Sequence, residues 1–186
     1  MTTWPQAVNP VFPAGYAPTP TDMTNWIQDN FSFLTSGIVF RGQMTSSQTF
    51  TTAGTFYPLQ IPSGSSTVLE DPYGGWSPSA TGSQPANSWL APYDGWYEVT
   101  VTIPLISANV SLAAAVAVSG GTPYTAAYVP GATGLDTGAS GSVTVALAGG
   151  VDYIQAGAIV SATATTVVLL GAGLYPSIEI TWVSNS

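Results

Sequence analysis

The sequence has 186 residues, which suits one domain with an appended segment, and its single cation, Arg41, against nine acidic residues gives a net charge of -8. Nucleic-acid binding and a polybasic membrane contact are excluded because both need clusters of cations, and no run of about 18 apolar residues is present to cross a membrane. The chain has no His, Lys or Cys, so imidazole and amine catalysis, thiolate nucleophiles and zinc sites with the usual ligands are excluded as well.

The first twenty residues hold five prolines, with Trp4, Phe12 and Tyr16 between them. Proline at this density favours an extended backbone, and a free tail has little use for large exposed aromatic side chains. We therefore interpret this segment as an arm that docks on a partner; the alternative is that it folds back on its own domain. The first five residues, MTTWP, lack the basic and apolar regions of a secretion signal, so we expect a soluble protein without one.

One short α-helix is expected after the proline-rich stretch. Thr19 or Thr21 can cap its first turn, Asp22 favours its positive end, and Gly37 ends it. Residues at spacings of three and four form one largely apolar face: Met23, Trp26, Ile27, Asn30 and Phe33 or Leu34. A helix of about three to four turns is marginally stable alone, so it must pack against the domain or a neighbouring subunit.

From Ile38 onward the pattern is strand and turn. Tyr97, Val99, Val101 and Ile103 alternate with polar residues, which predicts a half-buried strand that Pro104 stops or marks as an edge. Residues 110–118 and 142–147 alternate in the same way. Further strands are expected at 38–44, 55–61, 124–129, 152–160, 165–170 and 177–183.

Strong turn pairs separate these strands: Gly74-Gly75, Asp94-Gly95, Gly120-Gly121, Pro130-Gly131 and Gly149-Gly150. About eight to ten short strands without helices between them predict an all-β fold, an antiparallel β-sandwich of jelly-roll type. We assign residues 1–36 to an N-terminal anchoring arm with the short helix, and residues 37–186 to the jelly-roll domain.

Only carboxylates could act as conventional catalytic groups, and their arrangement argues against it. Glu70 and Asp71 are adjacent, so on a strand they point to opposite faces. Asp94 lies in a turn, and Glu98 alternates onto the solvent-facing side of its strand. No acidic cluster has the spacing of a calcium-binding loop. We therefore expect no enzyme, no catalytic residue, no metal and no cofactor.

Two further groups are candidates for interaction. The aromatic residues between 73 and 97 could form a sugar-stacking platform or an interface hot spot, or could fill the core and plug one end of the sandwich. Ala113, Ala115 and Ala117 form a small-residue stripe opposite the Val/Leu face of their strand. Since interface cores are depleted of charge, the stripe and the scarcity of charge favour an oligomer with these alanines at the subunit contact.

The stretch LEDPYGGWSPSATGSQPANSWLAPYDGWYEVTVTIPL, residues 69–105, resembles the centre of the complement/tumour-necrosis-factor-like trimeric jelly rolls. Pro92, Gly95 and Tyr97 match the family pattern P-x-x-G-x-Y, and Trp89 and Leu90 stand where the preceding strand lies. Residues 116–121, 145–154 and 177–183 resemble later strands, although Gly120-Gly121 replaces the usual Asn-Gly turn and Gly150 stands where Asp is usual. The resemblance implies a trimeric jelly roll.

The N-terminal segment resembles the leaders of virion proteins from tailed bacteriophages of actinobacteria. It has Trp4, a Pro/Gly-rich run, Thr21-Asp22-Met23 and Asn25-Trp26-Ile27-Gln28-Asp29, with Gln28 in place of the usual Arg. That family includes head-decoration (minor capsid) proteins and minor tail or fibre proteins. The resemblance implies a non-enzymatic virion structural protein, a homotrimer whose arm grips the particle while the jelly roll projects outward.

On this reading the protein is a capsid-decoration (cement) protein on the outer surface of the capsid, and its partners are its own copies and the major capsid protein. The residues expected to anchor it to the particle are Trp4, Phe12, Tyr16, Trp26 and Ile27. The alternative is a minor tail or fibre protein that binds a host receptor or glycan through its jelly roll.

Overall fold

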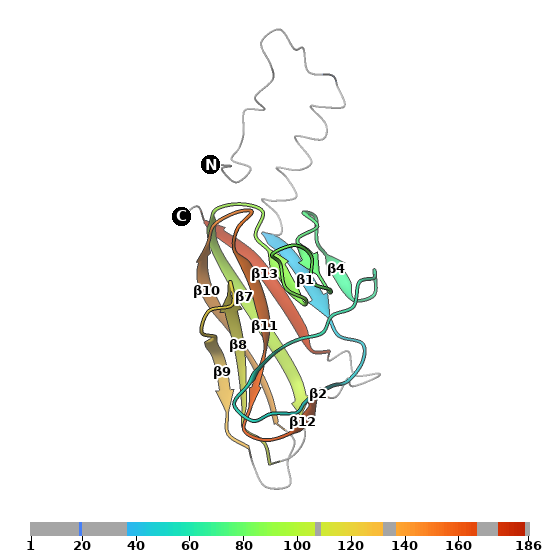
Figure 1. Cartoon of the computed structure of the whole chain (residues 1–186), viewed down its shortest axis with the longest axis vertical. Helices are drawn as coiled ribbons and strands as arrows, with labels where there is room; N and C mark the ends of the chain where they lie inside the picture. Colours follow the sequence, from blue (N-terminus) through green and yellow to red (C-terminus); the bar gives the residue numbers. More distant parts are fainter. Residues whose placement is uncertain (1–18, 20–36, 107–108, 132–136, 167–174, 185–186) are drawn as a thin grey trace.

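The computed structural model of the chain describes residues 19, 37–106, 109–131, 137–166 and 175–184 (Figure 1). This part of the chain is an all-β domain of antiparallel strands, as predicted. None of the described residues is helical, and so none belongs to a helix long and apolar enough to span a membrane. The predicted helix before Gly37 lies outside the described residues.

Two sheets form the domain. The strands of the first, in spatial order, are β10 (Thr137–Leu147), β7 (Gly95–Ile106), β13 (Ser177–Ser184), β1 (Ile38–Gln43) and β4 (Val68–Glu70). Those of the second are β5 (Trp76–Ser77), β6 (Ser88–Leu90), β11 (Tyr153–Val160), β8 (Leu112–Val118) and β9 (Tyr124–Val129), with β3 (Phe56–Pro58) also paired to β11. A separate small ribbon pairs β2 (Gln48–Phe50) with β12 (Ala164–Thr166).

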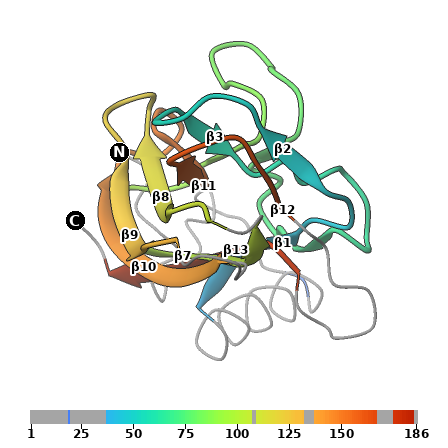
Figure 2. The same cartoon turned by 90° about the horizontal axis from the view of Figure 1, so that it is seen from below.

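The chain crosses repeatedly between the two sheets. It passes from the first sheet to the second between β7 and β8, and returns between β9 and β10. It crosses again from β10 to β11 and comes back to end in β13, in the centre of the first sheet. The view along the long axis shows the two layers facing each other (Figure 2). Crossings of this kind are typical of a jelly roll, the sandwich arrangement expected from the sequence.

The alternation along β7 determines which side chains enter the core. Tyr97, Val99, Val101 and Ile103 are fully buried, and Ile178 and Ile180 on β13 cover them from the neighbouring strand. The facing sheet contributes buried residues of the same kind: Leu112, Ala114, Val116 and Ile154. Each buried Val, Leu or Ile side chain contributes about 1.5–3 kcal/mol of transfer free energy, so this interior stabilises the domain.

Pro104 does not end β7, which continues to Ile106. The pairing of β7 with β13 stops at Thr102, and its pairing with β10 is irregular between Ile103 and Ile106. The proline therefore stands where no neighbour needs its missing N–H group. Stopping the strand was wrong. Because β7 lies between β10 and β13, the proline marks an edge only locally, beyond the last pair with β13.

Along one side of the sandwich the edge strands of the two sheets, β9 and β10, lie in close contact, which a glycine permits. A β-carbon at Gly141 of β10 would overlap the carbonyl oxygen of Ala126 in β9, so these two edge strands approach more closely than any other residue allows. Figure 2 shows β9 and β10 side by side at this edge. Contact between the outer strands leaves less free sheet edge there for pairing with other chains.

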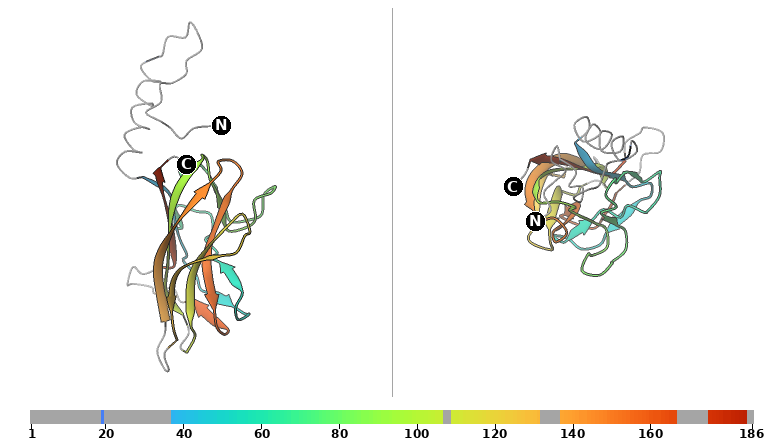
Figure 3. Two further views of the ribbon diagram at one scale, coloured as in Figure 1. Left: turned by 90° about the vertical axis from the view of Figure 1, so that its left-hand side faces the viewer. Right: turned by 90° about the horizontal axis from the view of Figure 1, so that it is seen from above.

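The described domain begins and finishes at the same end of the sandwich (Figure 3). The backbone N–H of Trp182 in β13 donates to the carbonyl oxygen of Gly37 at 2.9 Å, and Ser184 pairs with Trp96 at the start of β7. The turns at 91–95, 119–123 and 148–152 lie at this end too, because the strands they join finish or begin there. We call it the arm-side end, since residues 1–36 join the domain at Gly37.

Candidate functional site

The residues predicted to anchor the protein lie outside the described residues: Trp4, Phe12, Tyr16, Trp26 and Ile27. Their role stays a prediction. The structure does describe the point where the arm joins the domain. Gly37 has a φ angle of 59°, the left-handed conformation in which many helices end, and a β-carbon there would lie 3.3 Å from Cγ2 of Thr181. The expected role of Gly37 as the end of a helix fits this geometry.

The alanine stripe lies on β8, where it is buried within a single chain. Ala113 is 9% exposed and Ala115 and Ala117 are less exposed still, although they face away from the core. The register places Ala113 between Ile159 and Tyr128, larger residues on either side. Beside Ala117, Gln155 donates to the carbonyl oxygen of Ala86. A trimer contact at the alanines stays a prediction, and on this face the larger side chains offer the exposed area.

The aromatic residues between 73 and 97 do not form one surface. Trp89 and Tyr97 are fully buried with ring centroids 5.6 Å apart, edge to face. Trp76 is half-buried and stacks on Phe40 at 4.9 Å. The interpretation as core was therefore correct for these three. Burial raises the pKa of the Tyr97 hydroxyl, which donates to the carbonyl oxygen of Tyr93 at 2.7 Å, so this group is structural.

Asp71 holds the aromatic core in place. Its Oδ1 accepts from the backbone N–H of Gly75 at 3.0 Å and from the indole N–H of Trp89 at 3.3 Å, and its Oδ2 accepts from the backbone N–H of Trp76 at 2.9 Å. Both oxygens thus accept from N–H donors. The carboxylate is therefore a structural acceptor for the Gly74-Gly75 turn, which follows it closely in the chain.

We expect Asp71→Asn to lower the free energy of unfolding by about 2 kcal/mol, because an amide presents one oxygen where the structure needs two, and an N–H donor then faces an NH₂ group. Equilibrium unfolding in urea at one fixed protein concentration measures this. Glu98→Gln is the matched control, since Glu98 accepts one exposed hydrogen bond from Ser142, at 2.8 Å. Equal stability of Asp71→Asn and the wild type would contradict the assignment.

The remaining described carboxylates also have structural partners. Asp94 accepts from the backbone N–H of Gly149, and Asp152 accepts from the backbone N–H of Ala148 and the hydroxyl of Ser119. Arg41 lies 3.0 Å from Glu179 and 4.0 Å from Glu70 on the exposed face of the first sheet. Within the described ranges, no group of three or more acidic residues could hold a metal ion. These described carboxylates therefore cap turns or take part in a surface ion network. None of them forms an acid–base pair that faces a cleft.

One surface depression of about 300 Å³ lies beside the short strands β3 and β5. Its lining residues are Gln60, Ile61, Pro62, Pro78 and Asn87. They include no aromatic ring on which a sugar could stack and no charged group that could act on a substrate. The depression therefore does not favour glycan binding.

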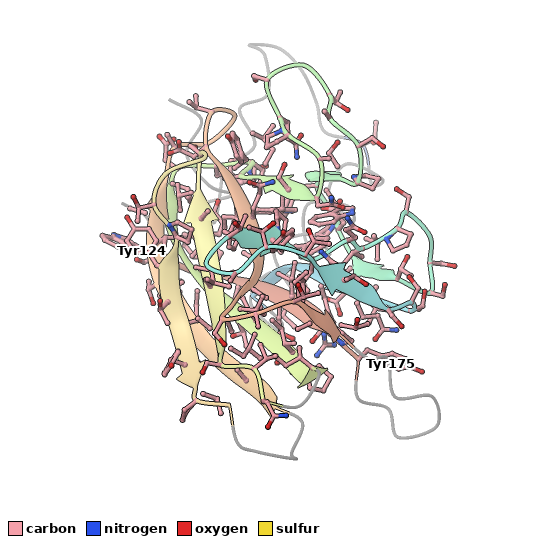
Figure 4. The ribbon with its side chains drawn as sticks, turned by 60° about the horizontal axis from the view of Figure 1, so that its bottom comes forward. Tyr124 and Tyr175 are labelled. Carbon is pink, nitrogen blue, oxygen red and sulfur yellow. The ribbon has the colours of Figure 1, made fainter. Side chains whose placement is uncertain are left out.

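Exposed apolar side chains gather at the arm-side end, and the sequence analysis did not identify them as a group. They are Tyr73, Trp96, Tyr124, Val151 and Val183. Tyr124 projects away from the sandwich at the start of β9, on the opposite side of the view from Tyr175 (Figure 4). Trp96 is outward because Tyr97 is inward, so the alternation of β7 was a signal for that residue. Val183 lies within β13 and alternates with Ile178, Ile180 and Trp182 in the same way. Tyr73, Tyr124 and Val151 lie in or beside turns, where periodicity carries no information.

No protein-family model and no curated protein matches the sequence. Among solved structures, the chain is similar to the Eiger TNF of S. frugiperda, with 12% identity and a TM-score of 0.44 over 80% of this chain and 92% of that one. It is also similar to the PRD1 vertex protein, with 13% identity and a TM-score of 0.39 over 80% of this chain and 100% of that one. A carbohydrate-binding module of a Cellvibrio mixtus lichenase has 16% identity and a TM-score of 0.34 over 78% and 98% of the two chains. These similarities are too distant to assign a function.

Proposed function

We propose that this protein is a non-enzymatic structural protein of a virion, a trimeric decoration protein held on the capsid by its N-terminal arm. The observation that carries the proposal is the place of the arm. Residues 1–36 join the domain at Gly37, at one end of the sandwich, so the loops between β7 and β8 and between β9 and β10 lie at the far end. A domain tethered in this way projects from whatever its arm grips.

The chemistry of the chain supports attachment rather than catalysis. Every described carboxylate is used in a turn, a surface ion network or a strand-to-strand hydrogen bond. Large aromatic groups on a proline-stiffened chain lose less conformational entropy on docking than a flexible tail would. Three arms on one trimer bind with avidity, so a weak single contact becomes lasting attachment. Few charged groups need to be desolvated where neighbouring copies meet the shell.

Electron microscopy of intact particles tests the location. A symmetric array of trimers on the outer surface of the shell is the expected result. Density for this protein only at the tail tip would contradict capsid decoration and would favour a minor tail or fibre protein. The two outcomes differ in position and in copy number, so one map separates them.

We expect the protein to sediment as a trimer at micromolar concentration, and Tyr128→Arg to weaken the trimer at least tenfold, about 1.4 kcal/mol. Tyr128 is 64% exposed and pairs with Ala113, so it offers exposed apolar area on the face of the alanine stripe. Arginine at Ala115 is unsuitable as a test, since that position is buried within one chain and the fold itself would suffer.

Leu69→Arg is the matched control, because Leu69 is an exposed apolar residue on β4 of the other sheet. Analytical ultracentrifugation measures both variants. A monomeric wild type would refute the trimer. Dissociation by Leu69→Arg but not by Tyr128→Arg would place the contact on the first sheet.

A further inference from the structure

The arm-side end carries an exposed apolar patch at the root of the arm. Trp96 is 41% exposed, Val183 is 51% exposed and Val151 is 71% exposed. They come from β7, β13 and the turn between β10 and β11, so three separate parts of the chain contribute. Isolated exposed apolar residues are ordinary, but a group of them marks a surface that is covered by something.

Pairing between the supporting segments brings the three residues to the same end of the sandwich. Ser184 pairs with Trp96, so Val183 lies on the strand next to that tryptophan. The pairing of Leu147 with Gly95, and the hydrogen bond from the backbone N–H of Gly149 to Asp94 at 2.8 Å, place the turn that holds Val151 against the start of β7. The patch is therefore built on strand ends that are fixed by pairing.

Among the described residues the patch has no cation, but one exposed carboxylate lies beside it: Glu98 is two residues from Trp96 on the outward face of β7 and accepts from Ser142 at 2.8 Å. Asp94 and Asp152 are the described acidic residues of the neighbouring turns, and both accept hydrogen bonds from backbone N–H groups. The one cation, Arg41, is engaged with Glu70 and Glu179 on β4 and β13. An apolar occupant of this end must therefore leave Glu98 in solvent, since burying an unpaired charge is costly.

One segment of this chain is joined to the domain beside the patch and is long enough to cover it. Residues 21–36 enter the domain at Gly37, whose carbonyl oxygen accepts from Trp182, the residue before Val183. A helix of that length would extend about 24 Å, and five strands span roughly 20 Å, so it can lie across the end of the first sheet. A helix of this length is only marginally stable in water unless its apolar face packs on a partner. Covalent attachment holds the patch at a high effective concentration next to it.

We propose that residues 21–36 fold as an amphipathic helix that packs on the apolar patch of its own domain, with Trp26 and Ile27 against Trp96 and Val183. The left-handed conformation of Gly37 is the geometry in which such a helix ends before β1 begins. The packed helix fixes the direction in which the preceding residues leave the domain.

This arrangement divides the arm into two parts, a consequence that rests on the proposed function. Trp4, Phe12 and Tyr16 remain available for the particle, whereas Trp26 and Ile27 are used within the protein. The anchoring segment is then residues 1–20, and residues 21–36 are a rigid connector. The packing itself requires no particle, so it can be tested on the free protein.

The chain contains no cysteine, so introduced pairs report on single contacts. We expect the full-length double variant Asn30→Cys with Ser184→Cys to form a crosslink within one chain when treated with a short bismaleimide. Both positions are polar, and Ser184 is exposed. The yield should exceed at least tenfold that of Asn30→Cys with Ala162→Cys, because Ala162 is exposed in the turn between β11 and β12, at the far end of the sandwich.

Adding Trp96→Ser and Val183→Ser to the first pair should reduce the crosslink to the level of the control. An equal yield in both pairs, or a yield that survives these two substitutions, would overturn the proposal. Crosslinked dimers from Asn30→Cys alone would also overturn it, by showing that the segments of neighbouring copies pack on one another. Crosslinked dimers from co-expressed Asn30→Cys and Ser184→Cys chains would show that a second copy covers the patch instead. Each result is obtained without particles, so a failure here is distinct from a failure to bind the capsid.

Discussion

A chain that lacks residues 1–20 is expected to remain a folded trimer and to lose its binding to particles stripped of this protein. Burying one large aromatic side chain contributes roughly 1.5–3 kcal/mol, which corresponds to about a tenfold to hundredfold change in affinity. Trp4, Phe12 and Tyr16 supply three such groups per arm. Because the arms of one trimer act together, their removal should reduce binding by much more than a single contact would.

Circular dichroism and sedimentation report on the fold and the trimer, and co-sedimentation with stripped particles measures binding. Full-length chains make the comparison sharper. Replacing Trp4, Phe12 and Tyr16 together by Ala should reproduce the loss. Replacing the polar neighbours Thr3, Gln6 and Asn9 by Ala should leave occupancy unchanged. Undiminished decoration by the aromatic-free arm would refute anchoring by the arm and would leave the arm-side end of the domain as the candidate contact.

The largest effect on stability is expected from Trp89→Ala, which should lower the free energy of unfolding by about 3–5 kcal/mol. Trp89 has no exposed surface and packs edge to face on Tyr97 with ring centroids 5.6 Å apart. Its indole N–H also donates to Asp71 at 3.3 Å. The substitution therefore creates a cavity between the sheets and removes one of the three donors to this carboxylate.

Trp96→Ala is the matched control, because the same residue type is changed a few positions away on the outer face of β7. Its effect on stability should be clearly smaller than that of Trp89→Ala, since Trp96 is 41% exposed and its removal leaves no cavity between the sheets. Urea unfolding followed by circular dichroism measures both variants. Similar losses of stability for the two variants would contradict the burial of Trp89 and the exposure of Trp96 in the structure.

Local patterns were sufficient for much of the fold. The alternation from Tyr97 to Ile103 correctly predicted which side chains of β7 are buried, because the side-chain period of a strand is a property of its own backbone. The turn pairs were informative for a similar reason. Gly74, Gly120 and Gly150 have φ angles of 64°, 72° and 71°, a region in which glycine is favoured over other residues.

The shortest strands gave no such signal. The sequence analysis did not predict β2, β4 or β5, and β6 entered only through the family resemblance. Each has two or three residues, too few to show a period, and is a strand only because a neighbour pairs with it. The run predicted at 165–170 overlaps β12 at Ala164–Thr166, and the rest of it lies outside the described residues.

The candidate surfaces depended on tertiary structure even more. The alanine pattern of β8 predicted a flat face, but the burial of Ala115 within one chain follows from the strands on either side of β8, which are distant in sequence. Asp71 could be seen as an acidic residue beside a turn, whereas its bond to Trp89, 18 residues away, required the packing of β6.

The sequence by itself determined the class of the domain, the inward face of its long strands, the positions of its glycine turns and the absence of conventional catalytic groups, since these depend on composition and on local backbone preference. Only the tertiary structure decided that Trp96, Val151 and Val183 lie at the same end of the sandwich, where the arm begins. Their neighbourhood is set by the register of pairing between β7, β10 and β13, and register is a relation between distant segments that no single stretch of the chain contains.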